Sequence, residues 1–599
     1  MIHKLKDLEV LVLDCQATGA NPVKGHLLEI AWTTLRATDP VDHAAASVQS
    51  HLVALPDDTE IPPRVERITG ISSGDMKSAG QSADIWKEIL KTPHRVNGAN
   101  RMDPRPAVIH FSRFESAFLH HLHQQHGPED EFPFSILCTH EIAKRLLPDL
   151  PRRGLRAIAG YFGHGVSEFR RSADHVSATA HIWQRFVPLL AEEQGIDTWE
   201  DLEQWLATSS ASSRTGRGYP MDPKVRRSLP DAPGVYRMLR NNGDLLYIGK
   251  AGSLKKRVNS YFQKRYHHSE HILEMLSQAR DIQTTITGSA MEAAILESDL
   301  IKRHSPPYNI ALRARDRKLW FCSKGFDEPT HEVDKPHLYG PLPGKEIIEA
   351  VSSIAILIED PSGLPLDDET CSKILCVSPA YGPDADTFRA GLEIFTEEYK
   401  ASFSEIPLAR AIPRMGTHLW RQHLADLEQR RQEKDDPADD REMVEEARGE
   451  DDVDKDDEPE SEGQRDWTPE SVSHVLEGII RSAALSIRRA RWYAMLSEAT
   501  LIWTPKGGED TVRRAIVFKG GDKVCSRNLG DDEIMDVSPG HRTPFWVRQQ
   551  HFDIMTFDRM RIVTNELRRL NSESREMTLH LGKKSILGKT ALARILPWV

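Results

Sequence analysis

The first 206 residues alternate short apolar runs with longer segments in which apolar positions recur at helical spacing. The runs EVLVLDC, HLLEIAWTTL and PAVIHF are typical of strands, because they are short and rich in aliphatic and β-branched residues. The segments RFESAFLHHLHQQH and VSATAHIWQRFVPLLAEE instead have the three- and four-residue apolar spacing of helices. This alternation predicts an α/β domain over residues 1–206.

The pattern changes several times further along the chain. The segment TSSASSRTGRGYP is rich in Ser and Gly and predicts a linker. The next stretch begins with hairpin signals and continues with helices, which predicts a compact second domain. The chain is therefore expected to be an α/β multidomain protein, in which residues 207–223 are a linker, 224–318 an α/β domain with an antiparallel sheet, 319–430 a mixed α/β region, 431–466 an acidic linker and 467–599 an α+β domain.

The last two structured regions show clear periodicity. Helices are predicted for GKEIIEAVSSIAIL, THLWRQHLADLEQRRQEK, SVSHVLEGIIRSAALSIRRARWYAMLSEA and FDRMRIVTNELRRL, and strands for TLIWTP and RRAIVFKG. One of these helices places Arg488, Arg489 and Arg491 beside Trp492 and Tyr493. A packed amphipathic helix is the preferred interpretation, and a contact with nucleic acid, which basic and aromatic residues together can make, is the alternative.

The overall charge of −12 conceals an uneven distribution. Between residues 433 and 462 there are 17 acidic and 4 basic residues, so the rest of the chain has a net charge of +1. Residues 224–318 contain 18 basic and 9 acidic residues. A basic domain attracts phosphate backbones, whereas an acidic run is usually solvated and disordered.

Other features narrow the class of protein. No stretch approaches the roughly 18 apolar residues of a membrane-spanning helix, so no membrane partner is expected. The start of the chain runs directly into a predicted strand, which argues against a secretory signal. The six cysteines are scattered and do not form a zinc-binding pattern. These features predict reduced thiols and a cytoplasmic location.

Several side chains in residues 224–318 suit the hydrolysis of a phosphodiester. Such a reaction needs a metal that polarises the phosphate, a base for the attacking water and cations for the developing charge. Glu297 lies in a predicted apolar helix and offers a carboxylate to Mg²⁺, which keeps several waters. Lys250 and Arg257 offer donors to phosphate oxygens, and tyrosine hydroxyls can relay a proton.

Each of these features has an ordinary alternative, namely a simple hairpin, a solvated helix face and an exposed glutamate. The order of these features along the chain indicates a nuclease more specifically than any single feature does. The segments LPDAPGVY, LLYIGKAGSLKKRVNSYF and ILESDLIKRHSPPYN follow one another. With these three segments, residues 228–313 resemble the GIY-YIG nuclease superfamily, and within it the UvrC/Cho excision-repair branch.

The resemblance implies an endonuclease that uses Mg²⁺ or Mn²⁺ and cuts one strand of DNA. It implies Glu297 as the metal ligand, Tyr247 as the general base assisted by Lys250, and Arg257 as the cation that stabilises the transition state. Tyr236, Tyr261 and Asn309 would orient water or phosphate. The expected DNA-binding residues are Lys250, Lys255, Lys256, Arg257, Lys264 and Arg265.

The first domain carries a second resemblance. VLVLDCQATGANP is similar to the Asp-x-Glu-x-Thr-Gly motif of DnaQ-like DEDD 3′–5′ exonucleases, which implies a ribonuclease-H-like fold. Asp14 keeps the first acid, but Gln16 replaces the second, and an amide is a poor substitute for a carboxylate that bridges cations. In VIHFSRFESAFL, Glu115 stands where the family has Asp. In RRSADHVSATAHIW, Arg170 and His175 stand at the family's His and Asp positions.

This site is therefore expected to be degenerate, and the domain to recognise DNA or a partner. The alternative is that Asp14, Glu115 and Asp174 hold one metal. For the whole chain, the resemblance to the UvrC/Cho branch predicts damaged or irregular DNA as substrate and a UvrB-like loader as a possible partner. A 3′–5′ exonuclease with an accessory GIY-YIG domain and a non-catalytic DNA-binding scaffold are the other two functions considered.

Overall fold

The computed structural model shows two compact units. The first comprises Met1–Ile286 and Pro306–Tyr308, and the second Thr287–Ser305 and Asn309–Val599. Each unit is described by itself. The structure describes residues 4–40, 47–57, 59–92, 104–165, 169–208, 218–263, 268–309, 317–323, 325–334, 336–403, 408–433, 466–505, 513–530, 552–581 and 585–599.

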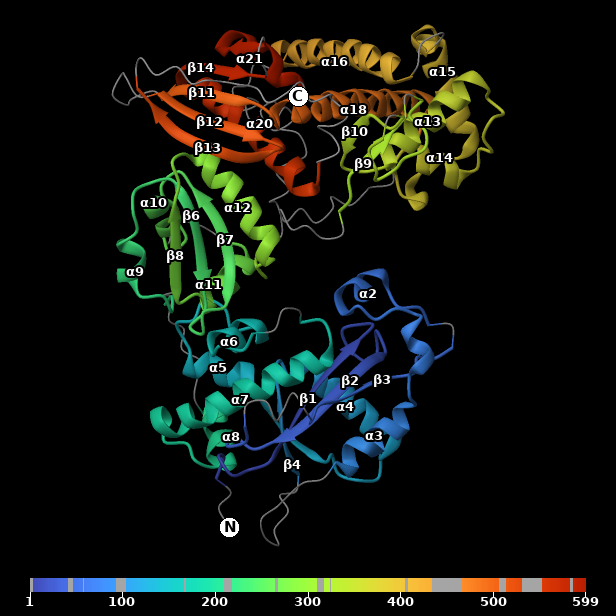
Figure 1. The fold of residues 1–599 in the computed structure, drawn as a ribbon. Coiled ribbons are helices and arrows are strands. Elements are labelled where there is room, and N and C mark those ends of the chain that lie inside the picture. The colour runs from blue at the N-terminus through green and yellow to red at the C-terminus, as the bar shows by residue number, and fades with distance from the viewer. Residues whose placement is uncertain are drawn as a thin grey trace. The chain divides into compact units, whose positions relative to one another are not determined.

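A five-stranded mixed sheet organises the first part of the first unit (Figure 1). Its order is β3-β2-β1-β4-β5, with β1 antiparallel to β2 and parallel to β4. The pairs β2–β3 and β4–β5 are antiparallel and parallel, respectively. The strands are β1 (Val10–Ala17), β2 (Leu27–Leu35), β3 (Gln49–Leu52), β4 (Arg105–Ile109) and β5 (Phe134–Cys138).

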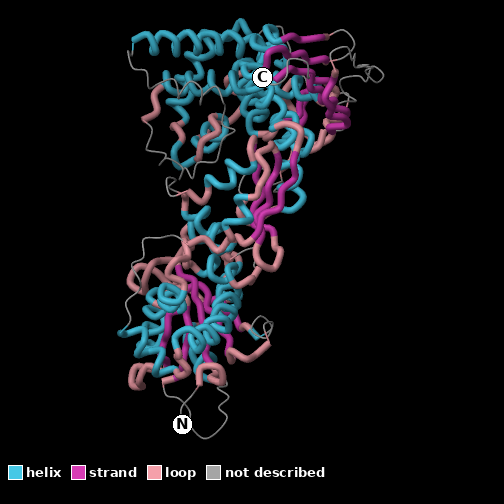
Figure 2. Tube along the Cα trace, turned by 90° about the vertical axis from the view of Figure 1, so that its left-hand side faces the viewer, coloured by secondary structure: helices cyan, strands magenta, loops and turns pink. Residues whose placement is uncertain are grey.

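Helices cover both faces of this sheet, as Figure 2 shows in cyan. Successive residues of β1 point to opposite faces. Leu11 and Leu13 pack in a core with α3 and α4, whereas Val10 and Val12 pack in a core with α7. Burial on both sides explains why this strand is apolar without interruption. The helices of this region are α2 (Pro63–Thr69), η1 (Asp75–Ser78), α3 (Ser82–Lys91), α4 (Arg113–His126), α5 (Thr139–Leu146), α6 (Leu155–Tyr161), α7 (Ser172–Gln194) and α8 (Trp199–Thr208).

A separate three-stranded sheet follows in the same unit. Its order is β7-β6-β8, and both pairings are antiparallel, as the sequence predicted. The strands are β6 (Gly234–Leu239), β7 (Leu245–Ala251) and β8 (Asp281–Ile286), and the helices around them are α9 (Pro223–Arg227), α10 (Leu254–Ser260) and α11 (Glu270–Gln278).

Helices α6 and α11 join the two parts of the first unit. The backbone N–H of Arg152 donates to the hydroxyl of Ser277 at 2.9 Å. Buried Gln278 accepts from Nε of Arg240 at 3.0 Å and donates to the hydroxyl of Tyr308. Gly160 lies against Gln278 so closely that any side chain at this position would overlap its amide group. Hydrogen-bonded polar groups and close packing therefore fix this contact.

The second unit combines a helical layer with a five-stranded antiparallel sheet. The sheet order is β13-β12-β11-β14-β15, and α12, α18 and α20 pack in its core (Figure 1). The sheet strands are β11 (Thr500–Pro505), β12 (Arg513–Lys519), β13 (Asp522–Leu529), β14 (Ser574–His580) and β15 (Ile586–Gly588). Their helices are α12 (Ala290–His304), α18 (Pro469–Leu496), α20 (Ile554–Glu573), α21 (Lys589–Ile595) and η4 (Leu596–Trp598).

The helical layer packs along the long helix α18. Trp492 and Tyr493 of this helix are buried, and Nη2 of Arg488 donates to the hydroxyl of Thr417. The helix is thus a packed amphipathic element, which was the preferred interpretation of its basic and aromatic residues. The other elements of the layer are β9 (Trp320–Cys322), β10 (Tyr339–Leu342), α13 (Glu346–Glu359), α14 (Asp368–Ile374), η2 (Pro379–Tyr381), α15 (Ala385–Phe403) and α16 (Leu408–Glu433).

These elements confirm a mixed α/β architecture, and the helices and strands expected from periodicity are present. The proposed domain limits stay a prediction, and most of the acidic linker 431–466 lies outside the described residues. All six cysteines are free. Among the described residues, no helix is both long enough and apolar enough to cross a membrane.

Gly160 gives a direct test of the contact between α6 and α11. An Ala in a helix is normally more stable than Gly by roughly 0.8–1 kcal/mol. At Gly160 we expect the opposite, a loss of about 1–3 kcal/mol from overpacking against Gln278. Thermal unfolding of Gly160→Ala should show a lower midpoint. Gly154→Ala, where a new Cβ would meet nothing within 4 Å, is the control and should change the midpoint little. A midpoint for Gly160→Ala equal to or above wild type would contradict this packing.

Candidate functional site

Two adjacent antiparallel strands bring the first two tyrosines of the predicted site together. Tyr236 lies on β6 and Tyr247 on β7, and their ring centroids are 6.1 Å apart. Gly249 is the direct partner of Tyr236 across the strands. A Cβ at Gly249 would lie within 2.8 Å of Tyr247 Cε1 and would overlap the Tyr236 hydroxyl. Glycine is therefore required here because both rings lie over its backbone.

Tyr261 completes this group from the end of α10. The hydroxyls of Tyr236 and Tyr261 are hydrogen-bonded at 2.9 Å, and only 1% of Tyr236 is exposed. Burial raises the pKa of Tyr236 well above its usual value, and the neighbouring Tyr261 and Tyr247 add to this effect. Tyr236 therefore remains a neutral phenol and can orient other groups, but it is unsuited to be a base.

Arg257 stands one helical turn before Tyr261. Its Nη2 donates to the Tyr261 hydroxyl at 3.3 Å, and its guanidinium lies 5.0 Å from the centre of the Tyr261 ring. Burial by itself would lower the pKa of Arg257, but Tyr261, Tyr236 and Tyr247 raise it overall. The side chain is thus an oriented cation that still reaches the surface.

The expected DNA-binding residues lie on the outside of this group. Lys250 is exposed at the end of β7, and Lys255 and Lys256 are exposed in the first turn of α10. Lys264 and Arg265 lie outside the described residues. The positive charges and the tyrosines are thus contributed by the same hairpin and helix.

Glu297 and Asn309 belong to the second unit. Glu297 lies on α12 with 9% of its surface exposed, and Asn309 is 6% exposed. Among the described residues, no three or more His, Cys, Asp and Glu side chains form a group that could hold a metal. A single carboxylate such as Glu297 fits Mg²⁺ or Mn²⁺ that is otherwise held by water and phosphate oxygens.

The predicted degenerate site of the first domain contains an ion pair. Nδ1 of His175 lies 3.2 Å from Oδ2 of Asp14, which is 6% exposed. Burial by itself would lower the pKa of His175, but the hydrogen bond to Asp14 and its charge outweigh burial and raise the pKa. The hydrogen bond therefore favours the protonated form of His175, and the imidazole occupies one oxygen of the Asp14 carboxylate.

The other residues predicted for this site also lack the properties expected of metal ligands. Burial raises the pKa of Glu115 to about 9, and the Asp14 carboxylate adds to the effect, so Glu115 is neutral at physiological pH. Asp174 accepts from the backbone N–H of Arg171 at 3.4 Å and caps α7. Gln16 is half-buried on β1 and Arg170 is exposed. The alternative of one metal held by Asp14, Glu115 and Asp174 therefore has no support in this geometry.

Two contacts were not predicted from the sequence: a histidine hydrogen bond to the backbone of Tyr261, and an aromatic stack in the first domain. Nε2 of His268 lies 2.8 Å from the carbonyl oxygen of Tyr261. In the first domain, Phe111 is 51% exposed, has a φ of 59° and stacks on His140 with centroids 4.1 Å apart. A positive φ for a bulky residue is rare. The backbone conformation of Phe111 has no signal in the local sequence, so it could not be predicted.

The segment that contains the tyrosine group is similar to known proteins. Residues 232–310 match the family model for the UvrC-like GIY-YIG domain. The chain carries a UvrC-like GIY-YIG nuclease domain. UvrABC system protein C of Psychrobacter sp. (strain PRwf-1) is 44% identical over 126 residues, which are 20% of this chain and 20% of that protein. The chain thus spans about a fifth of the length of the curated relatives that it matches first.

Two solved structures are also similar. The GIY-YIG N-terminal endonuclease domain of UvrC from Thermotoga maritima, bound to magnesium as its catalytic divalent cation, is 33% identical. It covers 15% of this chain and 100% of its own, with a TM-score of 0.14. Exonuclease X in complex with 5′ overhanging duplex DNA is 17% identical and covers 33% of this chain and 99% of its own, with a TM-score of 0.23. The GIY-YIG match contains Tyr236, Tyr247, Arg257, Glu297 and Asn309.

Gly249→Ala should disturb the tyrosine group of the GIY-YIG domain. Because Tyr236 is buried and its ring cannot move away freely, we expect a loss of about 1–3 kcal/mol of stability. Urea unfolding measures this loss. Gly252→Ala is the matched control, since a Cβ there would meet nothing within 4 Å. Equal stability of the two variants would show that Gly249 is not constrained by the rings.

The Asp14–His175 pair predicts a pH dependence of stability. The folded-state pKa of His175 is raised, so its contribution is fully present below the unfolded value of about 6.5 and is lost as pH rises through the folded value. The difference in unfolding midpoint between wild type and His175→Asn should therefore be largest near pH 6 and shrink toward pH 9. His120→Asn, at an exposed position on α4, serves as control. A difference independent of pH would contradict the ion pair.

Proposed function

We propose that this protein is a metal-dependent DNA endonuclease that nicks one strand of damaged or structured DNA in a UvrC/Cho-like repair role. The observation that supports this most is the match of residues 232–310, because one segment supplies tyrosines, a cation and a carboxylate in the family's order. The contact of Tyr236, Tyr261 and Arg257 adds geometric support, since these residues are oriented before any substrate is bound.

The general base is assigned to Tyr247. Its ring lies beside that of Tyr236, but Tyr247 is only half-buried, whereas Tyr236 is fully buried. Tyr236 keeps its proton and positions Tyr261 through their hydrogen bond. Lys250, three residues after Tyr247 on the same strand, is assigned to assist this base with its positive charge.

Arg257 is assigned to the phosphate. Its guanidinium is oriented by the Tyr261 ring and hydroxyl, and its planar fork suits the oxygens of a phosphorane-like transition state. Glu297 would hold Mg²⁺ or Mn²⁺, which supplies Lewis-acid polarisation of the scissile phosphate. Asn309 is assigned to orienting water or phosphate. Lys255 and Lys256 extend the positive surface along the DNA backbone.

The first domain is proposed to have a ribonuclease-H-like fold that recognises DNA or a partner. The mixed sheet order β3-β2-β1-β4-β5 supports this fold, and the Asp14–His175 pair supports a role without a metal. We further propose a cytoplasmic location and a UvrB-like loader as a partner. Both proposals rest on the similarity to the excision-repair branch.

Cleavage of end-labelled duplexes tests the function. Plain, nicked, bubbled and bulky-adducted duplexes are incubated with Mg²⁺ or Mn²⁺ and wild type, Glu297→Ala or Asp14→Ala. We expect a discrete internal nick that is lost in Glu297→Ala. A metal contributes several kcal/mol to the transition state, so the rate should fall by about 10²-fold or more.

Asp14→Ala is the matched control, because it removes a buried carboxylate from the first domain. It should leave nicking unchanged. A product ladder that shortens from the 3′ end and disappears in Asp14→Ala would show an exonuclease instead. DNA binding without cleavage at either metal would indicate a scaffold.

A further inference from the structure

Helix α12, which carries Glu297, makes three sets of ion pairs with residues more than 200 positions further along the chain. Glu292 accepts from Arg514 at 3.2 Å and Lys523 at 2.9 Å, which lie on β12 and β13. Asp299 accepts from Arg559 of α20 at 2.8 and 3.0 Å. These contacts lie wholly within the second unit.

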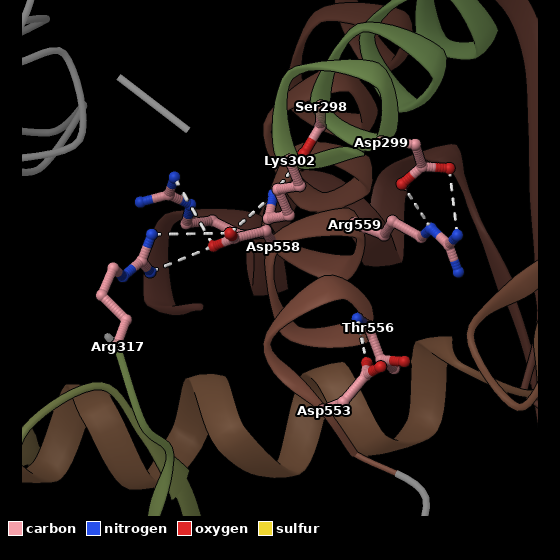
Figure 3. Close-up of polar contacts among 9 residues, drawn as sticks. Ser298, Asp299, Lys302, Arg317, Asp553, Thr556, Asp558 and Arg559 are labelled. Carbon is pink, nitrogen blue, oxygen red and sulfur yellow. Dashed lines mark hydrogen bonds and ion pairs between the residues drawn. The ribbon is translucent and has the colours of Figure 1, made fainter. Parts of the chain in front are cut away.

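The third set is buried. Nζ of Lys302 lies 2.8 Å from Oδ2 of Asp558, and Lys302 and Asp558 are 4% and 0% exposed. Arg317 also reaches Asp558, with Nη2 3.2 Å from Oδ1. Figure 3 shows Lys302 and Arg317 directed at Asp558. It also shows Asp299 facing Arg559, the residue that follows Asp558 on α20. Buried charges in this arrangement require their partners, so α12 and α20 are held in one register.

The three α12 residues that make these ion pairs share one side of the helix. Residues in an α-helix are about 100° apart around the axis, so Glu292, Asp299 and Lys302 fall within an arc of about 80°. On the same count, Glu297 lies about 140° or more from each of them. Met291 and Ile295 lie next to the charged arc and enter the core formed with β11, β12 and α20. One side of α12 is therefore anchored, and Glu297 projects from the opposite side.

We propose that β12, β13 and α20 form a positioning element for the nuclease, which fixes the rotation and register of α12 and so the direction of the Glu297 carboxylate. This inference rests on the proposed role of Glu297 as metal ligand. A carboxylate that is the main protein ligand of Mg²⁺ must be held closely, since rotation of its helix moves it away from the phosphate. Arg559 is the key positioning residue, because it binds Asp299 with two nitrogens and also pairs with Asp522 of β13.

Arg559→Gln tests the proposal, with Arg569→Gln as matched control. Arg569 lies on the same helix and, among the described residues, pairs along it with Glu566 and Glu573. Both variants are made in the full chain. Hydrogen–deuterium exchange of residues 290–304 and the Mg²⁺ concentration for half-maximal nicking are measured for each.

We expect Arg559→Gln to exchange faster in α12 and to need about 10-fold more Mg²⁺, the usual scale for losing a residue that orients a ligand. The charge swap Asp299→Arg with Arg559→Asp should restore much of both values. Exchange and Mg²⁺ requirement equal to those of Arg569→Gln would overturn the proposal. Faster exchange with an unchanged Mg²⁺ requirement would also overturn it, because α12 would then be anchored without an effect on Glu297.

The same experiment separates this inference from the proposed function. If wild type nicks no duplex with either metal, the proposed function fails, and the assignment of a positioning role to β12, β13 and α20 fails with it. The exchange measurement still reports whether these elements anchor α12. If wild type nicks and Glu297→Ala does not, the proposed function stands, and only the Arg559 variants decide the inference.

Discussion

The need to compensate a fully buried carboxylate determines much of the second unit. Asp558 has no exposed surface, and a charge in that position is stable only with close cationic partners. Lys302 supplies one from α12 and Arg317 supplies another. The ion pair between Lys302 and Asp558 thus joins the end of the GIY-YIG match to α20, about 250 residues further along the chain. The terminal region thereby becomes part of the support of the proposed metal-binding helix.

Buried acids elsewhere in the chain are compensated differently. Asp14 pairs with His175, and Glu115 stays protonated because burial raises its pKa. Both solutions occupy or neutralise oxygens that a two-metal exonuclease would need. Asp14 and Glu297 therefore differ in their surroundings. The Asp14 carboxylate is hydrogen-bonded to the imidazole of His175 at Oδ2. Glu297 lies on a helix whose opposite side is anchored by ion pairs.

The first domain is also fixed to the hairpin sheet through specific polar contacts. Gln278 accepts from Arg240 and donates to Tyr308, and the glycine at 160 lets α6 approach it. Tyr308 is adjacent in sequence to Asn309, a proposed site residue. These contacts fix the first domain to the hairpin sheet directly, which a flexible tether would not do.

The sequence by itself predicted the secondary structure and proposed the candidate site residues. Apolar periodicity located strands such as β1 and helices such as α18, because one or both of their faces are buried. The order of Tyr236, Tyr247, Arg257 and Glu297 indicated the chemistry, since residue type and spacing suffice to define it. Tertiary structure alone decided that Trp492 packs in a core, that His175 binds Asp14 and that Arg559 anchors α12. These contacts join residues about 70 to 260 positions apart, and no local pattern of charge or hydrophobicity specifies which distant partner a side chain will meet.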